Sequence, residues 1–186
     1  MKIAFTGTHS TGKTTLLEAL RTEPSLSHFY FDANVTRWVK SLGFAINEHT
    51  SSESQEINML KRVANLNTYD NLIADRSIAD VLAYSINSDM VTKESLKYQQ
   101  DLVDNNIHKY DILFYIPPVF PGVDDGERAV GEEYRAKIDA SIIRIVNPRP
   151  LNVYVLDQLS IRERLQKIMD VINEARTSKN TPTGNN

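Results

Sequence analysis

Residues 7–14 read Gly7-Thr8-His9-Ser10-Thr11-Gly12-Lys13-Thr14, which is the pattern G-x-x-x-x-G-K-[ST]. The apolar run at residues 1–6 predicts a short strand before this stretch, and residues 15–20 predict the start of a helix after it. The two glycines let the backbone curl so that successive N–H groups point at a phosphate, and the helix start adds unpaired donors. The stretch therefore predicts a loop that binds the phosphates of a nucleoside triphosphate.

The side chains of this loop have separate expected roles. Lys13 places a compact cation on the β- and γ-phosphates, which makes it a candidate catalytic residue, and the Thr14 hydroxyl can hold Mg²⁺. His9 is expected to contribute its backbone N–H rather than its ring. We assign nucleotide binding to the loop and the residue after it, namely Gly7, Thr8, His9, Ser10, Thr11, Gly12, Lys13, Thr14 and Thr15.

The composition is that of an ordinary globular chain. Of 186 residues, 41% are apolar and 24% are charged, the net charge is −3, and there is no cysteine. We expect one domain at residues 1–175 and a polar tail at 176–186. No dense basic run and no long apolar run occur, which argues against a stable nucleic-acid partner and against a membrane partner. The predicted core strand begins at Met1, leaving no room for a signal peptide, so we expect a cytoplasmic protein.

Predicted strands and helices alternate along the chain, which indicates a three-layer α/β fold with a mostly parallel sheet covered on both faces. The continuous apolar run at 111–116 is typical of a strand buried on both faces. Residues 119–131 are rich in glycine and acidic residues and predict a mobile loop. Val35, Trp38, Val39 and Leu42 have helical spacing, which predicts a helix with these four residues buried.

Asp75 ends the short apolar strand predicted at residues 72–75, and Arg76 follows it. An acid at this point can hold Mg²⁺ or its waters, and the alternative is an acid that only favours the dipole of the next helix. Arg76 can grip a phosphate or, alternatively, form a surface salt bridge. Ser77 is positioned to cap the following helix.

Arg128 and Arg135 flank the end of the predicted loop. Arginines on such a loop can close over a transferring phosphoryl group and neutralise its charge, with Gly126 and Gly131 as hinges. The alternative is a solvated segment in which these arginines pair with neighbouring glutamates. We treat both arginines as candidate catalytic residues.

Asp32 ends the second predicted strand, where a kinase needs an acid as a base or orienter for the acceptor. It is therefore a candidate catalytic residue, although a helix cap suits its position equally well. Arg37, one turn after Asn34, can hold an acceptor.

Three segments together resemble the P-loop nucleoside and nucleotide kinases. They are residues 7–15, then Asp75-Arg76 leading into Asp80-Val81-Leu82-Ala83-Tyr84, then Asp125-Gly126-Glu127-Arg128 with Glu133-Tyr134-Arg135. The acid-Arg-Ser string is similar to that of deoxynucleoside and thymidylate kinases. The whole set looks like a small ATPase-type kinase family that includes the nicotinamide riboside kinase domain and many phage-encoded kinases.

The resemblance implies a five-stranded parallel sheet with a short lid at about 119–135, with Arg128 and Arg135 as lid arginines. It also implies that Gln55, Arg37 and Arg76 face the phosphoryl acceptor. Such proteins tend to have Glu-x-x-Arg after the second strand, whereas this chain has Asn34-Val35-Thr36-Arg37. Since an amide cannot take a proton, either Asp32 replaces that glutamate at the acceptor beside Asn34, or activity is altered.

The leading interpretation is an enzyme that uses ATP and Mg²⁺, held by Thr14 and Asp75, to phosphorylate a nucleoside or (deoxy)nucleoside monophosphate. A nicotinamide riboside kinase is the nearest alternative. A P-loop ATPase or switch, and a catalytically impaired nucleotide-binding protein, are the others. The expected partner is the small-molecule acceptor, and a homodimer is left open.

Overall fold

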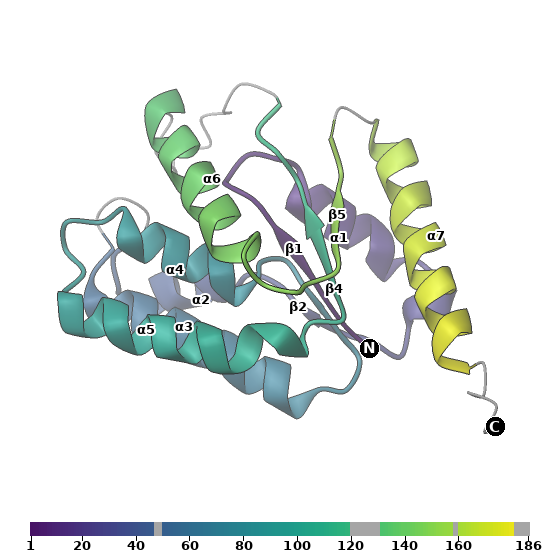
Figure 1. Ribbon diagram of the computed structural model, residues 1–186, viewed down its shortest axis with the longest axis horizontal. Coiled ribbons are helices and arrows are strands. Elements are labelled where there is room, and N and C mark those ends of the chain that lie inside the picture. The colour runs from purple at the N-terminus through teal and green to yellow at the C-terminus, as the bar shows by residue number, and fades with distance from the viewer. Residues whose placement is uncertain (47–49, 120–130, 158–159, 181–186) are drawn as a thin grey trace.

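Five parallel strands form one sheet in the order β2-β3-β1-β4-β5 (Figure 1). They are β1 (Lys2–Thr6), β2 (Tyr30–Asp32), β3 (Leu72–Ala74), β4 (Ile112–Tyr115) and β5 (Val153–Val155). The computed structural model describes residues 1–46, 50–119, 131–157 and 160–180. The predicted α/β fold with a five-stranded parallel sheet is confirmed.

Helices connect the strands and begin where the sequence supplies caps. Ser77 and Asp80 form a reciprocal capping box at the start of α4, and Ser51 accepts from the Ser54 N–H at the start of α3. Short 3-10 turns lie at Pro24–Leu26 and Ile107–Lys109. The helices are α1 (Lys13–Arg21), α2 (Val35–Ser41), α3 (Ser52–Thr68), α4 (Ile78–Ile86), α5 (Lys93–Asn106), α6 (Glu132–Val146) and α7 (Ile161–Asn180).

The two faces of the sheet bury separate apolar clusters, because side chains of a strand alternate between faces. Ile3 and Phe5 of β1 pack with the cluster that includes residues of α1 and α7. Ala4 packs with the cluster that includes residues of α3, α4, α5 and α6. Figure 1 shows α1 and α7 on one side of the sheet and α3 to α6 on the other. This three-layer arrangement places every strand-to-helix loop at the carboxyl edge of the sheet.

The short helix predicted around Trp38 is present, but its predicted buried face is partly wrong. Val35 and Val39 are buried, whereas Trp38 is 43% exposed and Leu42 is 50% exposed. α2 packs against α3 beyond the edge of the sheet, so only one narrow stripe of this seven-residue helix is covered. The Trp38 ring instead lies 6.0 Å from the Lys61 ammonium.

Part of the predicted lid, with Arg128 and the hinge residue Gly126, lies outside the described residues. Gly131 directly precedes α6, and Arg135 lies in the first turns of that helix. Within the described ranges, we find no helix with the length and apolar character needed to cross a bilayer.

Candidate active site

The loop of residues 7–12 leaves β1 with a backbone that few side chains tolerate. Gly7 and Gly12 have φ values of 141° and 89°, and Ser10 has a φ of 55°. A Cβ on Gly7 would lie 2.4 Å from the carbonyl oxygen of Ile116, which follows β4. The loop therefore needs glycine at residue 7 both for its backbone conformation and for the close approach of the neighbouring strand end.

Lys13, the first residue of α1, folds its side chain back onto this loop. Its ammonium donates to the Gly7 carbonyl at 2.8 Å, to the Thr11 hydroxyl at 2.8 Å and to the Thr8 carbonyl. The residue is buried, so the cation lies in a low-dielectric setting where its field is strong. Thr14 and Thr15 follow in the first turn of α1 and are exposed.

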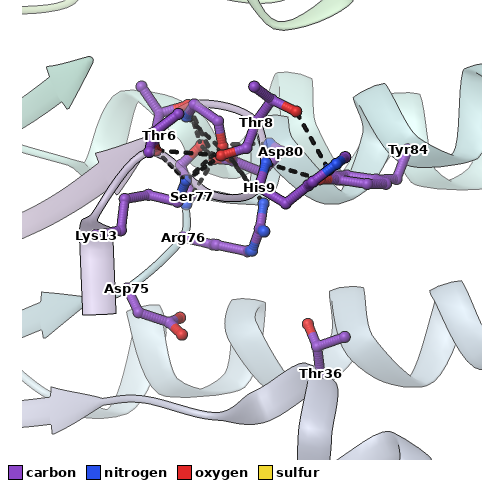
Figure 2. Close-up of polar contacts among 12 residues, drawn as sticks. Thr6, Thr8, His9, Lys13, Thr36, Asp75, Arg76, Ser77, Asp80 and Tyr84 are labelled. Atoms are coloured by element: carbon purple, nitrogen blue, oxygen red, sulfur yellow. Dashed lines mark hydrogen bonds and ion pairs between the residues drawn. The ribbon is translucent and has the colours of Figure 1, made fainter. Parts of the chain in front are cut away.

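Asp80 holds the base of the loop to the start of α4. Its fully buried carboxylate accepts from the Thr6 hydroxyl at 2.8 Å, the Gly7 N–H at 2.9 Å and the Ser77 hydroxyl at 2.7 Å. Arg76 lies 3.6 Å from the same carboxylate. Figure 2 shows the loop residues, Ser77 and Tyr84 gathered near Asp80. Asp80 therefore joins β1, the loop and α4 into one rigid unit.

Tyr84, one turn after Asp80, supports the middle of the loop. Its hydroxyl accepts from the His9 N–H at 3.1 Å and lies 2.9 Å from His9 Nδ1. The Arg76 guanidinium lies over the Tyr84 ring, 5.1 Å from its centroid, and Arg76 Nη1 is 3.4 Å from the Gly7 carbonyl oxygen. Arg76 therefore contacts the loop and does not lie free at the surface.

Asp75 follows β3 and is ion-paired with Arg62 of α3, at 3.0 Å. Its other oxygen accepts from the Asn34 N–H at 3.3 Å. Burial pushes the pKa of Asp75 up, but the charges of Arg62 and Arg76 outweigh it and hold this pKa below its ordinary value. Asp75 is therefore a fixed anion at neutral pH.

Asp32 lies behind this pair and is buried, 3% exposed. It accepts from Asn65 at 2.9 Å and lies 3.9 Å from Arg62. Burial raises the pKa of Asp32 above its ordinary value, against the opposing pull of Arg62. Asp32 does not cap α2, because Asn34 occupies the N-cap position.

Two buried polar atoms on α3 have no hydrogen-bond partner among the described residues: Gln55 Oε1 and Arg62 Nη2. Gln55 is 5% exposed and Arg62 is 1% exposed. Between them in sequence, Asn58 accepts from Arg62 Nε at 3.0 Å and donates to Thr36 at 3.2 Å. Since unpartnered buried polar groups are costly, this row of side chains is suited to a ligand that supplies both a donor and an acceptor.

The backbone conformation at residue 34 explains why this chain has asparagine where similar kinases tend to have glutamate. Its φ of 63° and ψ of 19° are left-handed, a conformation in which asparagine is several-fold enriched. Its side chain makes no capping hydrogen bond to α2, whereas its backbone N–H reaches Asp75. The backbone at residue 34 therefore favours asparagine over glutamate, whatever the chemistry of the site.

We expect Asn34→Gly to leave the free energy of unfolding within about 0.5 kcal/mol of wild type, and Asn34→Ala to lower it by about 1 kcal/mol. The reason is that a left-handed backbone raises the free energy of alanine, which has a Cβ, but not that of glycine. Urea denaturation monitored by circular dichroism measures both. Equal losses in the two variants would mean that the asparagine side chain, and not the backbone, matters here.

The arginines predicted for the site differ in their solvent exposure. Arg37 on α2 is exposed. Arg135 is 1% exposed and pairs with Glu132 at 2.8 Å in the first turns of α6. Arg128 lies outside the described residues. The pairing with a glutamate matches the alternative weighed for Arg135, while its burial sets it apart from a solvated surface charge.

The donor set suits Mg²⁺ held mainly by phosphates and water. The described residues contain no group of three or more His, Cys, Asp or Glu side chains that could enclose a metal ion. Thr14 offers an exposed hydroxyl, and both carboxylate oxygens of Asp75 already accept hydrogen bonds. Mg²⁺ usually keeps several waters in phosphate-transfer sites, so one hydroxyl and one nearby anion fit it.

Sequence reasoning missed three supporting residues. The sequence motif that contains Asp80 does not by itself indicate its role, but the spacing Ser77-x-x-Asp80 is that of a capping box and could have identified it. No sequence pattern around Arg62 indicates its role, because its partners Asp32 and Asp75 lie at the end of β2 and directly after β3. Arg164 of α7 contacts the loop at the Thr11 carbonyl, 153 positions away in the chain.

Comparison with known proteins identifies a family whose model matches the chain and solved structures with a similar fold. The family described as an AAA domain matches residues 2–164. No protein with a curated description matches the chain.

The solved structures that resemble this one include several kinases and the NadR protein. Deoxyadenosine kinase from M. mycoides, solved with dCMP and dCDP, is 20% identical with a TM-score of 0.62, over 94% of this chain and 100% of that chain. The NadR protein in complex with NR is 21% identical with a TM-score of 0.73, over 92% of this chain and 50% of that chain. Thymidylate kinase from Candida albicans is 16% identical with a TM-score of 0.66, over 94% and 91% of the two chains. At these identities the likeness establishes the fold.

Proposed function

This chain belongs to the AAA-domain family, whose match spans residues 2–164, and on that premise we propose that it is a P-loop kinase. It transfers the γ-phosphoryl group of ATP, with Mg²⁺, to a nucleoside or a (deoxy)nucleoside monophosphate. The family and the loop support nucleotide binding, and the polar groups beside the loop support a second, small-molecule substrate.

One observation carries the proposal: the buried polar row of α3 meets the Asp75-Arg76 pair that borders the phosphate loop. Arg62 donates to the Asp75 carboxylate and to the Arg76 carbonyl, both at 3.0 Å, and Arg76 in turn reaches the Gly7 carbonyl. Gln55 and Arg62 each have one buried polar atom without a hydrogen-bond partner in the part of the chain that the structure describes. An ATPase or switch needs no binding site for a second organic substrate, so buried polar groups that still lack partners among the described residues favour a kinase with an acceptor site.

The chain's own residues stabilise the transfer mainly by position and charge. The acceptor oxygen, which is a hydroxyl oxygen of a nucleoside or a phosphate oxygen of a monophosphate, bonds to the γ-phosphorus, the bond to the bridging oxygen breaks, and ADP leaves with its electron pair. Lys13 and the loop N–H groups neutralise charge on the phosphates, and Thr14 would hold Mg²⁺, with Asp75 ordering the water around it. Bound Mg²⁺ would supply further charge neutralisation.

In this proposal the carboxylates of Asp75 and Asp32 have different roles. Asp75, 16% exposed at its side chain, lies on the acceptor side and takes the hydroxyl proton or orients the hydroxyl. Asp32, for which we predicted the same role, is more deeply buried and acts through Arg62 and Asn65. Because the transition state for phosphoryl transfer is loose, early proton removal contributes little and a carboxylate with a depressed pKa suffices.

Arg76, Arg37 and Asn34 complete the proposed acceptor side. Arg76 contacts the loop at the Gly7 carbonyl and lies 3.6 Å from the Asp80 carboxylate, while Arg37 and Asn34 lie on α2 and at its N-cap. Arg128 and Arg135 are retained in the proposal as the arginines that neutralise the transferring group, on the strength of the sequence motif.

Nicotinamide riboside is the second candidate acceptor. NadR, which has the same fold over half of its length, was solved with NR. A deoxynucleoside or deoxynucleotide acceptor is supported by the Asp75-Arg76-Ser77 string. Nicotinamide riboside and a nucleoside would each accept the phosphoryl group on a sugar hydroxyl, and a monophosphate would accept it on a phosphate oxygen.

A coupled ADP-release assay tests the proposal. ATP and Mg²⁺ are supplied first without acceptor, then with ribo- and deoxynucleosides, their monophosphates and nicotinamide riboside. We expect ADP release that depends on one acceptor. Release without acceptor would replace the proposal with an ATPase or switch, and silence across the panel would indicate a protein that binds nucleotide without turnover.

Gln55→Met is expected to separate acceptor binding from stability. The variant removes a buried acceptor atom without a partner, so the free energy of unfolding stays the same or rises by up to about 1 kcal/mol. The KM for the acceptor should rise at least about tenfold, with the KM for ATP unchanged. Gln166→Met, on the exposed side of α7, is the matched control and should change neither value. A lower stability with normal acceptor KM would assign Gln55 to the fold alone.

A further inference from the structure

Arg164 reaches the phosphate loop from α7, on the face of the sheet opposite α3 and α4. Its side chain is buried, 4% exposed. Nη1 donates to the Thr11 carbonyl at 3.2 Å, while Nη2 and Nε donate to the Asp157 carbonyl at 2.7 Å and 3.2 Å. One guanidinium therefore joins the loop to the segment that follows β5.

The contact with Thr11 determines how the next N–H points. A trans peptide group is planar, with its carbonyl and N–H on opposite sides, and no described peptide bond is cis. Holding the Thr11 carbonyl toward α7 therefore turns the Gly12 N–H away from α7. The hydrogen bond to the Thr11 carbonyl puts the guanidinium in direct contact with this peptide, and a Cβ added at Gly12 would also lie 3.8 Å from Arg164 Nη1. Arg164 thus orients one of the N–H groups that face a bound phosphate in this type of loop.

No carboxylate among the described residues is hydrogen-bonded to the Arg164 guanidinium. Within the part of the chain that the structure describes, all three of its hydrogen bonds go to backbone carbonyl oxygens. Burial lowers the pKa of Arg164, and the charge of Asp157 opposes that shift, yet a guanidinium remains protonated in proteins. A buried cation without a bonded anion beside the loop favours a polyphosphate, whose charge compensates it.

We propose that Arg164 is a positioning residue of the nucleotide site, which fixes the Thr11–Gly12 peptide and raises the affinity for nucleoside di- and triphosphates. The inference rests on the nucleotide-binding part of the proposed function. It does not depend on the identity of the acceptor, because Arg164 approaches the loop from the face that α1 and α7 cover.

Equilibrium binding of ADP, measured by calorimetry without any acceptor, tests this inference on the full chain. Arg164→Gln should weaken ADP binding about 10- to 100-fold, and Arg164→Lys, which keeps the charge but not the fork of donors, should lie between it and wild type. Arg162→Gln removes the same charge from an exposed position of α7 and should bind ADP as wild type does. Steady-state kinetics of Arg164→Gln should show a raised KM for ATP and an unchanged KM for the acceptor.

The outcomes separate the two proposals. Measurements are made well below the melting temperature of each variant, so that a loss of folded protein does not enter the binding constant. ADP binding by Arg164→Gln equal to wild type, or an equal loss in Arg162→Gln, would overturn the role of Arg164 and leave the proposed function intact. Absence of ADP binding by the wild-type chain would overturn the proposed function itself.

Discussion

Replacing Lys13 by alanine is expected to lower acceptor-dependent ADP release about a thousand-fold. The Lys13 ammonium is held against the loop by oxygens of Gly7, Thr8 and Thr11, in a buried setting where one charge has a large effect on a phosphoryl group. No other lysine among the described residues contacts these loop oxygens in the hydrogen bonds observed. The coupled assay used for the acceptor panel measures the loss.

Lys97→Ala is the matched control for this variant. Lys97 is exposed on α5 and forms only a surface ion pair with Asp101, which contributes little to stability. Its turnover should equal that of wild type. Turnover by Lys13→Ala within tenfold of wild type would contradict the assigned role, provided that its melting temperature shows a folded protein.

Replacing Arg62 by alanine is expected to lower the free energy of unfolding by about 3–5 kcal/mol at pH 7. Arg62 is fully buried and is the cation nearest to both Asp75, at 3.0 Å, and Asp32, at 3.9 Å, in the ion pairs observed. Its removal leaves carboxylates in a buried site without their counter-charge. Urea denaturation measures the change, and Lys61→Ala, on the exposed side of the same helix, should cost less than about 1 kcal/mol.

The pH dependence of this difference has a definite sign. Arg62 helps to hold the pKa of Asp75 below its ordinary value, so the stability from this pair is complete above the unfolded pKa of about 4 and is lost as pH falls through the folded pKa. The gap between wild type and Arg62→Ala should therefore narrow as the pH falls below about 4. A gap that stays constant from pH 7 to pH 3 would mean that the ion pair is not its source.

The phosphate loop was predictable from the sequence because its information is local. Two glycines at fixed spacing, a strand before them and a lysine at the start of a helix lie within fifteen residues, and the structure has this order. The cap at Ser77 and the acid at the end of β3 are local for the same reason. Parallel pairing followed from the alternation of strands and helices.

The buried face of α2 was not predictable in the same way. The spacing of Val35, Trp38, Val39 and Leu42 correctly indicated a helix. Periodicity does not show, however, how much of the apolar face of that helix its neighbours cover. Because α2 packs beyond the edge of the sheet, Trp38 and Leu42 remain exposed.

The fold class could be predicted from the alternation of strands and helices along the chain. The phosphate loop and the acid-arginine pair after β3 could be predicted because each rests on hydrogen-bonding groups or side-chain spacing within one short segment. The groups that support them become apparent only in the folded chain: Asp80 beneath Gly7, Arg62 between Asp75 and Asp32, and Arg164 against Thr11. These contacts join residues 13 to 153 positions apart in the chain. The physical reason is that charge compensation depends on distance in space, which no local pattern of residues encodes.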